Sequence, residues 1–229
     1  CHVDTEAAPQ MTRDQTPILV LTLPDDEARR AALIAQLNDY GLAHELVEGV
    51  DGRRGLSPDH AARIDRAATE ERLGRALSDA EYACALSHIA IWQRVAEGGP
   101  QGAIVLEDDA TILPAFAEFV RDWSPAFGGL VLLAHLKARV NGRRGRRLGR
   151  LGFLPLVENC YGAYGYALAP AEAQALIAAN TPVWSPPDWP ADLAALGALV
   201  AHPMIVSHAP VGCGPSHLET DRSRLARLA

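Results

Sequence analysis

Residues 103–109 read AIVLEDD, four apolar residues followed by three consecutive acids. The apolar part, 103–106, predicts a buried strand, and ligands of α/β sheets bind where such strands end. Adjacent carboxylates repel one another and are costly near a core unless a cation compensates them. Glu107, Asp108 and Asp109 therefore predict a site for Mg²⁺ or Mn²⁺, which prefer oxygen ligands. In an extended chain Glu107 and Asp109 point to one side and can face one metal; a solvated acidic turn is the alternative.

The sequence before this stretch predicts a strand–helix–strand unit. Residues 18–23 (ILVLTL) are apolar and β-prone, 27–40 carry apolar residues at helical spacing, and 44–50 form a second β-prone run. A turn at 24–26 opens the helix and Gly41 ends it. Strands connected in this way favour a parallel pair.

The rest of the chain adds helices and strands to this unit. Ser78 and Glu81 match a capping box, which predicts a helix that ends at 98–100. The other expected elements are surface helices within 57–77, helices at about 113–122, 170–178 and 191–201, strands at 130–134, 164–169 and 204–206, and an irregular segment at 184–190. We expect an α/β fold with a mostly parallel central sheet in a single domain, residues 11–209, followed by a polar tail, 210–229.

Composition excludes several classes of protein. The chain has 229 residues, 48% of them hydrophobic, and a formal net charge of −7. This apolar fraction is ordinary for a globular protein, so the chain can bury a core. No apolar run approaches the roughly 20 residues of a membrane-spanning helix. The acidic balance disfavours general nucleic-acid binding, which needs cations against phosphates.

The cysteines and the first residues bear on the compartment. The four cysteines are Cys1, Cys84, Cys160 and Cys213. They form no C-x-x-C pair, which disfavours a zinc knuckle, and their wide spacing disfavours a disulfide scaffold. We expect free thiols in the cytoplasm. Residues 1–10 have no signal-like apolar stretch, and we expect an added segment there with the natural start at Met11.

Two weaker motifs lie in the first half of the chain. His88 follows Glu81 by about two helical turns, so the two residues share a helix face. The turn 51–52 ends a strand, where an acid can accept hydrogen bonds from ribose hydroxyls, and Arg29 and Arg30 lie in the preceding helix. A structural histidine, a routine turn and solvated arginines are the alternatives.

Two more motifs lie in the second half. The segment 162–166 (GAYGY) precedes a strand, and its glycines let a ligand or another backbone approach closely. Asp188, Trp189 and Asp192 lie in or beside a proline-rich segment, where a carboxylate can take a proton from a sugar hydroxyl while the ring stacks on the sugar. A plain turn and a capped helix start are the alternatives.

In this order the motifs resemble one family, the family 25 glycosyltransferases of bacterial lipooligosaccharide and lipopolysaccharide synthesis. The resemblance runs from about residue 18 to about residue 199. It is carried by 18–30, 50–52 (VDG), 78–92 (SDAEYACALSHIAIW), 103–109, 162–166 with Pro170, and 187–189 (PDW).

The resemblance implies a GT-A-like fold for a nucleotide-diphospho-sugar, with Mn²⁺ or Mg²⁺ held by Glu107 and Asp109. It implies inverting transfer of a hexose, most often galactose from UDP-galactose, to a hydroxyl of a glycan or lipid-linked saccharide. A third metal ligand would be His208 or His217.

The resemblance also distributes the other roles. The donor would be bound by Thr22, Leu23, Arg30, Asp51, Gly52, Glu81, His88 and Asp108. The acceptor would be bound by Tyr164, Gly165, Tyr166 and Trp189. Asp188 would be the base, with Asp192 as the second candidate.

Departures from the family pattern leave rival functions open. Pro24-Asp25-Asp26 stands where the family has a basic residue and a serine, and Ala80 replaces a glycine. One rival is a non-catalytic homologue that binds a nucleotide sugar or glycan. Another is a nucleotidyltransferase, although the first strand–helix turn has no glycine-rich phosphate loop.

A basic segment, 137–150 (KARVNGRRGRRLGR), stands out in this acidic chain. Its cations would suit a phosphate-bearing acceptor or the anionic inner leaflet of a membrane. We expect an acceptor contact or a peripheral membrane contact there, with a solvated loop as the alternative.

Overall fold

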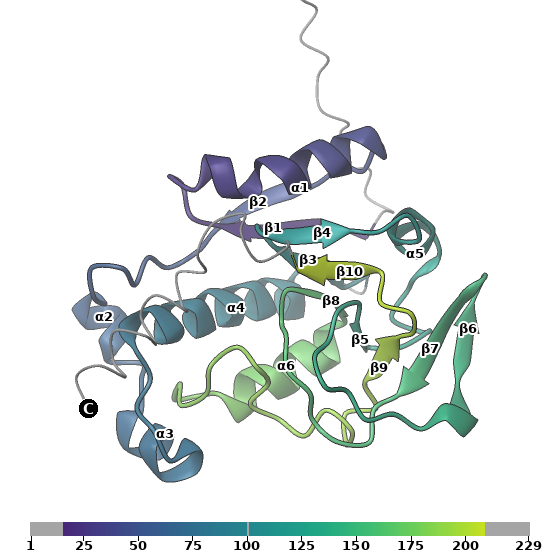
Figure 1. Ribbon diagram of the computed structural model, residues 1–229. Helices are drawn as coiled ribbons and strands as arrows, with labels where there is room; N and C mark the ends of the chain where they lie inside the picture. Colours follow the sequence, from purple (N-terminus) through teal and green to yellow (C-terminus); the bar gives the residue numbers. More distant parts are fainter. Residues whose placement is uncertain (1–15, 100, 209–229) are drawn as a thin grey trace, which may run out of the picture.

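An eight-stranded mixed sheet runs through the computed structural model, which describes residues 16–99 and 101–208 (Figure 1). The strand order is β2-β1-β3-β8-β5-β9-β7-β6. These strands are β1 (Ile18–Thr22), β2 (Glu45–Glu48), β3 (Ala103–Glu107), β5 (Leu130–Leu132), β6 (Arg146–Leu148), β7 (Leu151–Pro155), β8 (Gly165–Leu168) and β9 (Leu199–Ala201). A separate antiparallel pair is formed by β4 (Ala110–Ile112) and β10 (Val206–His208).

The expectation of a mostly parallel sheet is wrong. Among the described residues, β2, β1 and β3 are parallel and so are β5 and β9, but the four other neighbouring pairs of this sheet are antiparallel. β8 lies between β3 and β5 and runs against both. A short buried strand has the same apolar pattern in either direction, so the sequence pattern alone does not distinguish the two cases.

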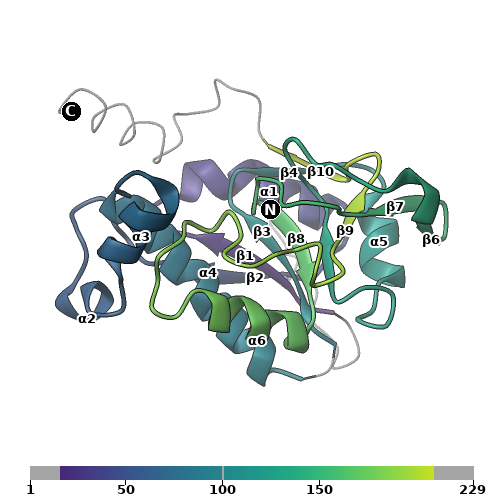
Figure 2. The ribbon, with the colours of Figure 1, turned by 90° about the horizontal axis from the view of Figure 1, so that it is seen from below.

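Helices cover both faces of the sheet (Figures 1 and 2). They are α1 (Glu27–Asp39), α2 (Pro58–Ala61), α3 (Arg66–Leu73), α4 (Asp79–Glu97), α5 (Phe116–Asp122) and α6 (Pro170–Ala179). β1 is buried throughout: its side chains at 18 and 20 join the core under α1 and α5, and those at 19 and 21 join the core with α4 and α6. This alternation follows from the two-residue period of a strand.

The N-terminal end of α4 is fixed by local chemistry. Ser78 Oγ accepts from the Glu81 N–H at 3.2 Å and the Glu81 carboxylate accepts from the Ser78 N–H at 2.9 Å, which confirms the predicted capping box. Ser87, further along the helix, accepts from the Val50 N–H at 2.8 Å. A Cβ on Gly52 would lie 2.6 Å from a backbone oxygen of α4, so only glycine lets this turn pack so closely. The loop after β2 is thus held on α4.

Two more expectations in the second half differ from the structure. The predicted helix over 191–201 is a turn, because Gly197 adopts a positive φ of 72° and the chain then continues as β9. The basic segment 137–150 is no open loop: it contains a 3₁₀ turn, Gly142–Arg144, and β6, which forms a hairpin with β7.

Some expectations concern residues outside the described part. The segment 1–10, Met11, the tail 210–229 and His217 all lie there. Within the described residues, no helix is both long enough and apolar enough to cross a membrane. Cys84 and Cys160 are free thiols.

Candidate functional site

The acid turn lies where parallel strands end. β1 is flanked in parallel by β2 and β3, with α1 on one face of the sheet and α4 on the other. In the chain, α1 connects β1 to β2 and α4 precedes β3, and β2 and β3 lie on opposite sides of β1. The ends of β1 and β3 therefore form a topological switch point. Thr22 Oγ1 donates to Asp108 Oδ2 at 2.9 Å across these ends. Ligands of α/β sheets bind at such a place.

One arginine of α1 contacts two acids of this turn. Arg29 Nε donates to Asp108 Oδ1 at 2.6 Å, and Arg29 Nη2 donates to Asp109 Oδ2. The side chains of Asp108 and Asp109 are only 8% and 10% exposed, so the guanidinium compensates two nearly buried charges. Burial raises the pKa of Asp108, although Arg29 and Thr22 favour its charged form.

Asp109 also faces a histidine from β10. The antiparallel register of β4 and β10 sets His208 opposite Ala110, and His208 Nε2 lies 3.1 Å from Asp109 Oδ2. Burial acts to raise the pKa of Asp109, but the hydrogen bond from His208 and the charge of Arg29 outweigh it, and the pKa is lowered. Asp109 Oδ1 is buried and has no hydrogen-bond partner among the described residues. This oxygen is therefore an unsatisfied acceptor within the acid turn.

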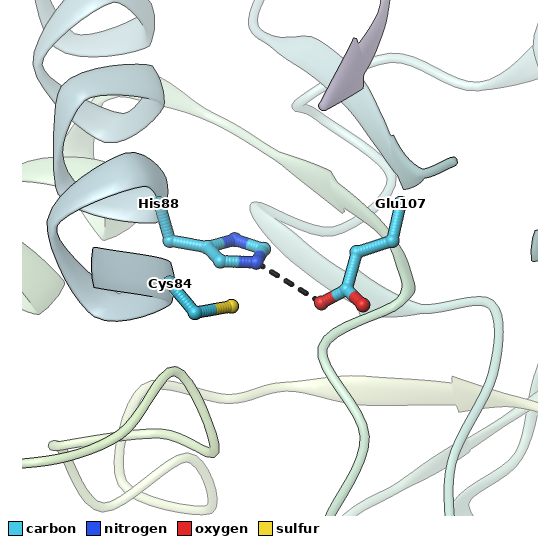
Figure 3. Close-up of side chains that lie close together, drawn as sticks. All are labelled: Cys84, His88 and Glu107. Carbon is cyan, nitrogen blue, oxygen red and sulfur yellow. Dashed lines mark hydrogen bonds and ion pairs between the residues drawn. The ribbon is translucent and has the colours of Figure 1, made fainter. Parts of the chain in front are cut away.

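Glu107 turns toward α4 (Figure 3). Its Oε1 lies 3.2 Å from His88 Nε2, and His88 Nδ1 lies 2.9 Å from the Tyr166 hydroxyl. That hydroxyl also accepts from Trp92 Nε1 at 2.9 Å. The three ring residues are fully buried, so the network fixes the orientation of the imidazole.

The expected metal ligands are therefore divided between two places. Asp109 and His208 face each other at one of them. Glu107 joins Cys84 and His88 at the other, where one ligand atom from each residue lies within 4.8 Å of the rest. Within the described chain, no group of three potential ligands unites Glu107 with Asp109 and His208.

The two base candidates lie in different settings. Asp188 is half-buried, and its Oδ1 accepts from the Gly162 N–H at 2.8 Å. Burial raises the pKa of the Cys84 thiol, and the charges of Glu107, Asp188 and Asp109 raise it further, so Asp188 acts electrostatically on the same thiol as Glu107. Asp192 is exposed, and its Oδ1 accepts from the Ala195 N–H within a turn.

The four residues expected to bind the acceptor lie in the interior. Tyr166 is fully buried, and its hydroxyl belongs to the network above. Trp189, 4% exposed, packs edge-on against Tyr166 with ring centroids 5.2 Å apart. Tyr164, 7% exposed, packs in the same way against His208, and Gly165 is buried. These residues therefore pack beneath the site, and they expose little surface that an acceptor could contact.

An open pocket adjoins the ends of β1 and β2. Its volume is about 660 Å³, and its lining residues are Pro24, Asp25, Glu48, Gly49, Asp51, Arg53 and Arg54. Arg53 Nε donates to Asp51 Oδ1 at 2.9 Å, and Arg53 Nη2 donates to Asp25 Oδ1 at 2.7 Å. The hydrogen bonds from Arg53 lower the pKa of Asp51 to about 2. Asp51 therefore faces this pocket as a carboxylate.

Other expected donor residues have structural partners. The buried carboxylate of Glu81 accepts from Arg75 at 2.9 Å as well as from the Ser78 N–H. Arg30 Nη1 donates to the Leu23 carbonyl at 3.1 Å, which braces the turn after β1. These contacts hold the backbone around the site.

The sequence assigns no specific role to two residues of the site: Arg29 is a candidate there only together with Arg30, and Cys84 belongs to the motifs only as part of the segment 78–92. Arg29, and not Arg30, contacts the acids, because neighbouring helix residues point about 100° apart and only one can face them. The sequence does not distinguish the two. Cys84 precedes His88 by four residues, a spacing that places both on one helix face and that could have identified it.

Comparisons with known proteins find glycosyltransferases. The family model described as glycosyltransferase family 25 (LPS biosynthesis protein) matches residues 15–192. A rat protein described as probable inactive glycosyltransferase 25 family member 3 is 28% identical over 95 residues, which are 40% of this chain and 17% of that protein. A protein of Acanthamoeba polyphaga mimivirus described as a procollagen lysyl hydroxylase and glycosyltransferase is 31% identical over 107 residues, 42% of this chain and 12% of that protein. The matched parts thus span less than a fifth of either relative.

Proposed function

Because the chain belongs to glycosyltransferase family 25, we propose that it transfers a hexose, with inversion, from a nucleotide diphosphate to a hydroxyl of a glycan or glycolipid. The donor we propose is UDP-galactose. The observation that carries the proposal is the half-satisfied carboxylate of Asp109, beside His208 and at a switch point of the sheet. The parallel unit of β2, β1 and β3 supports a GT-A-like nucleotide-sugar fold.

The residues at the acid turn fit a divalent cation. Asp109 Oδ1 is buried without a partner among the described residues, and His208 Nε2 lies beside the other oxygen of the same carboxylate. A carboxylate and an imidazole suit Mn²⁺, and the carboxylate suits Mg²⁺. Asp109 and His208 would hold the ion. When bound, the ion would offset the negative charge that develops on the departing nucleotide diphosphate.

The nucleotide is proposed to occupy the pocket at the ends of β1 and β2. A pocket of about 660 Å³ falls within the range of ordinary small-molecule sites. Asp51 would accept hydrogen bonds from ribose hydroxyls, and Arg53 and Arg54 supply positive charge near phosphates. The diphosphate would then reach toward the acid turn, since Pro24 and Asp25 line the pocket and lie two and three residues after the end of β1.

Asp188 is proposed as the base that takes the proton of the acceptor hydroxyl. Its hydrogen bond from Gly162 orients the carboxylate, and Trp189 beside it is anchored in the core. An oriented carboxylate within reach of the acceptor is what an inverting displacement requires. Tyr164 and Tyr166 would support this surface from within.

A non-catalytic homologue is the second candidate. Arg29 already compensates both Asp108 and Asp109, so the acid turn is stable without a cation. A related rat protein is described as probably inactive. Such a chain would bind a nucleotide sugar through the same pocket without metal and without transfer.

Calorimetry with nucleotides separates the two candidates. Titration of UDP into the chain is expected to show binding that Mn²⁺ strengthens. Asp109→Asn is expected to weaken this binding by at least about tenfold, because a lost charge-assisted contact costs about 1.5–3 kcal/mol. Asp122→Asn, at the end of α5, is the matched control and should bind as the wild type does. Metal-independent binding in all three proteins would favour the non-catalytic homologue, and no binding to any nucleotide would contradict both candidates.

The basic segment 137–150 is proposed to contact an anionic acceptor or the inner membrane surface, with the protein in the cytoplasm. Its arginines at 143, 144, 146, 147 and 150 are exposed on and beside the β6–β7 hairpin. Arg146 also lies over the Phe127 ring at 4.8 Å, so Arg143 and Arg144 are the better positions for a test.

Vesicle binding tests this surface. Arg143→Gln/Arg144→Gln is expected to weaken binding to vesicles with anionic lipid by about 30-fold, at roughly 1 kcal/mol for each arginine. Arg54→Gln/Arg63→Gln removes the same charge from two exposed positions on either side of α2, at the opposite end of the molecule, and should bind these vesicles as the wild type does (Figure 1). Equal losses in both double variants would show a net-charge effect and contradict a specific surface.

A further inference from the structure

A cluster of three chemically different ligands lies beside the acid turn (Figure 3). Cys84 and His88 are one turn apart on α4, and Glu107 ends β3. The sulfur, one imidazole nitrogen and one carboxylate oxygen all lie within 4.8 Å of one another. A helix and the strand that follows it in the chain thus present their side chains to a single point.

We propose that Cys84, His88 and Glu107 form a zinc-binding site that is separate from Asp109 and His208. A set of one sulfur, one nitrogen and one oxygen donor matches zinc, which accepts all three, better than it matches Mg²⁺ or Mn²⁺. Two ligands about 2.0–2.1 Å from a tetrahedral centre lie about 3.4 Å apart. His88 Nε2 and Glu107 Oε1 are 3.2 Å apart, close to that value.

The surroundings of His88 orient it for this role. Zinc-bound histidines almost always use their second ring nitrogen in a hydrogen bond that fixes the ring. His88 Nδ1 has such a partner in the Tyr166 hydroxyl at 2.9 Å, and Trp92 holds that hydroxyl from the other side. The tyrosine oxygen can accept from both rings, which leaves Nε2 directed at Glu107.

The charge around the sulfur also suits a cation. Burial raises the pKa of the Cys84 thiol well above its usual range, and the charges of Glu107, Asp188 and Asp109 raise it further. These acids disfavour a bare thiolate but would be compensated by a zinc ion. As the zinc–sulfur and zinc–nitrogen bonds form, the thiol proton and the proton between His88 and Glu107 pass to solvent.

The geometry leaves one zinc position open. Three protein ligands plus an open fourth position are typical of zinc sites that bind water or a small ligand. The Glu107 side chain is 23% exposed, so solvent reaches the cluster from that side. This site does not depend on the proposed sugar transfer, because its ligands differ from those assigned to the donor metal.

Cobalt absorption and zinc calorimetry test the site. Metal-free protein titrated with Co²⁺ is expected to show a thiolate-to-cobalt charge-transfer band, and one equivalent of Zn²⁺ per chain is expected to abolish this band by displacing the cobalt. Cys84→Ser should abolish the band and weaken zinc binding by more than about 100-fold, because even outer partners of a ligand are worth 10–100-fold. Glu107→Gln should keep the band and weaken the affinity.

Matched variants distinguish this cluster from other metal ligands. Cys160→Ser, which changes a buried thiol outside the cluster, should retain the band, and so should Cys1→Ser and Cys213→Ser. Asp109→Asn should also retain it, so that failure of the proposed donor site leaves this result unaffected. Absence of the band from the wild type, or its survival in folded Cys84→Ser, would overturn the proposal.

Discussion

Asp188→Asn is expected to slow sugar transfer by about 10²–10⁴-fold, the usual contribution of a positioned general base. Asparagine keeps the Oδ1 that accepts from the Gly162 N–H, so the segment around it should retain its conformation. It cannot take a proton from the acceptor hydroxyl. The expected loss is therefore in the rate of the chemical step, with the KM for the donor nearly unchanged.

Asp192→Asn is the matched control for this prediction. Asp192 is exposed and accepts from the Ala195 N–H within a turn, a bond that asparagine preserves. The rate should remain close to that of the wild type. The measurement is release of UDP from UDP-galactose with and without acceptor sugars. A slow Asp192→Asn with a fast Asp188→Asn would reverse the assignment of the base.

The sequence correctly predicts the elements that depend on interactions between residues close together in the chain. The first strand, the helix after it and the parallel second strand follow from apolar spacing and a short connection, and all three are present. The capping box at the start of α4 rests on two residues three positions apart, and it too is confirmed. These features can be predicted without knowing which residues distant in the sequence they contact.

The elements that sequence mispredicts depend on distant partners. β8 is a buried apolar strand whose direction is set by β3 and β5 on either side of it, not by its own residues. The segment 191–201 has helical composition, but its last three residues pair with β5 and β7 as β9. Tertiary pairing thus overrides local preference at both places.

The acid turn shows the same limit within one motif. Two-residue alternation predicts that Glu107 and Asp109 share a side, but alternation holds only while the strand continues. β3 ends at Glu107, and the turn that follows carries Asp108 and Asp109 together toward Arg29. The sequence therefore identifies the right three acids, and the structure divides them between α4 and α1.

Arg29→Met is expected to destabilise the metal-free chain by about 3–5 kcal/mol, because it leaves two nearly buried carboxylates without their compensating charge. Asp108 and Asp109 are 8% and 10% exposed, so water cannot fully replace the guanidinium. Arg30→Met is the matched control. It removes hydrogen bonds to backbone carbonyls at the exposed turn and should cost about 1 kcal/mol. Urea unfolding with a chelator present measures both variants.

The response of Arg29→Met to Mn²⁺ then separates the two functions proposed for the acid turn. If Asp109 and His208 accept a cation, the ion supplies part of the positive charge that Arg29 provided, and stability should rise with Mn²⁺ concentration. The rise should disappear in Arg29→Met/Asp109→Asn, which lacks the acid. A variant that Mn²⁺ does not stabilise would mean that the turn is built for the guanidinium alone, as in a non-catalytic homologue. Arg29 thus either compensates the acids together with a bound metal ion or compensates them alone, and the response to Mn²⁺ distinguishes these two cases.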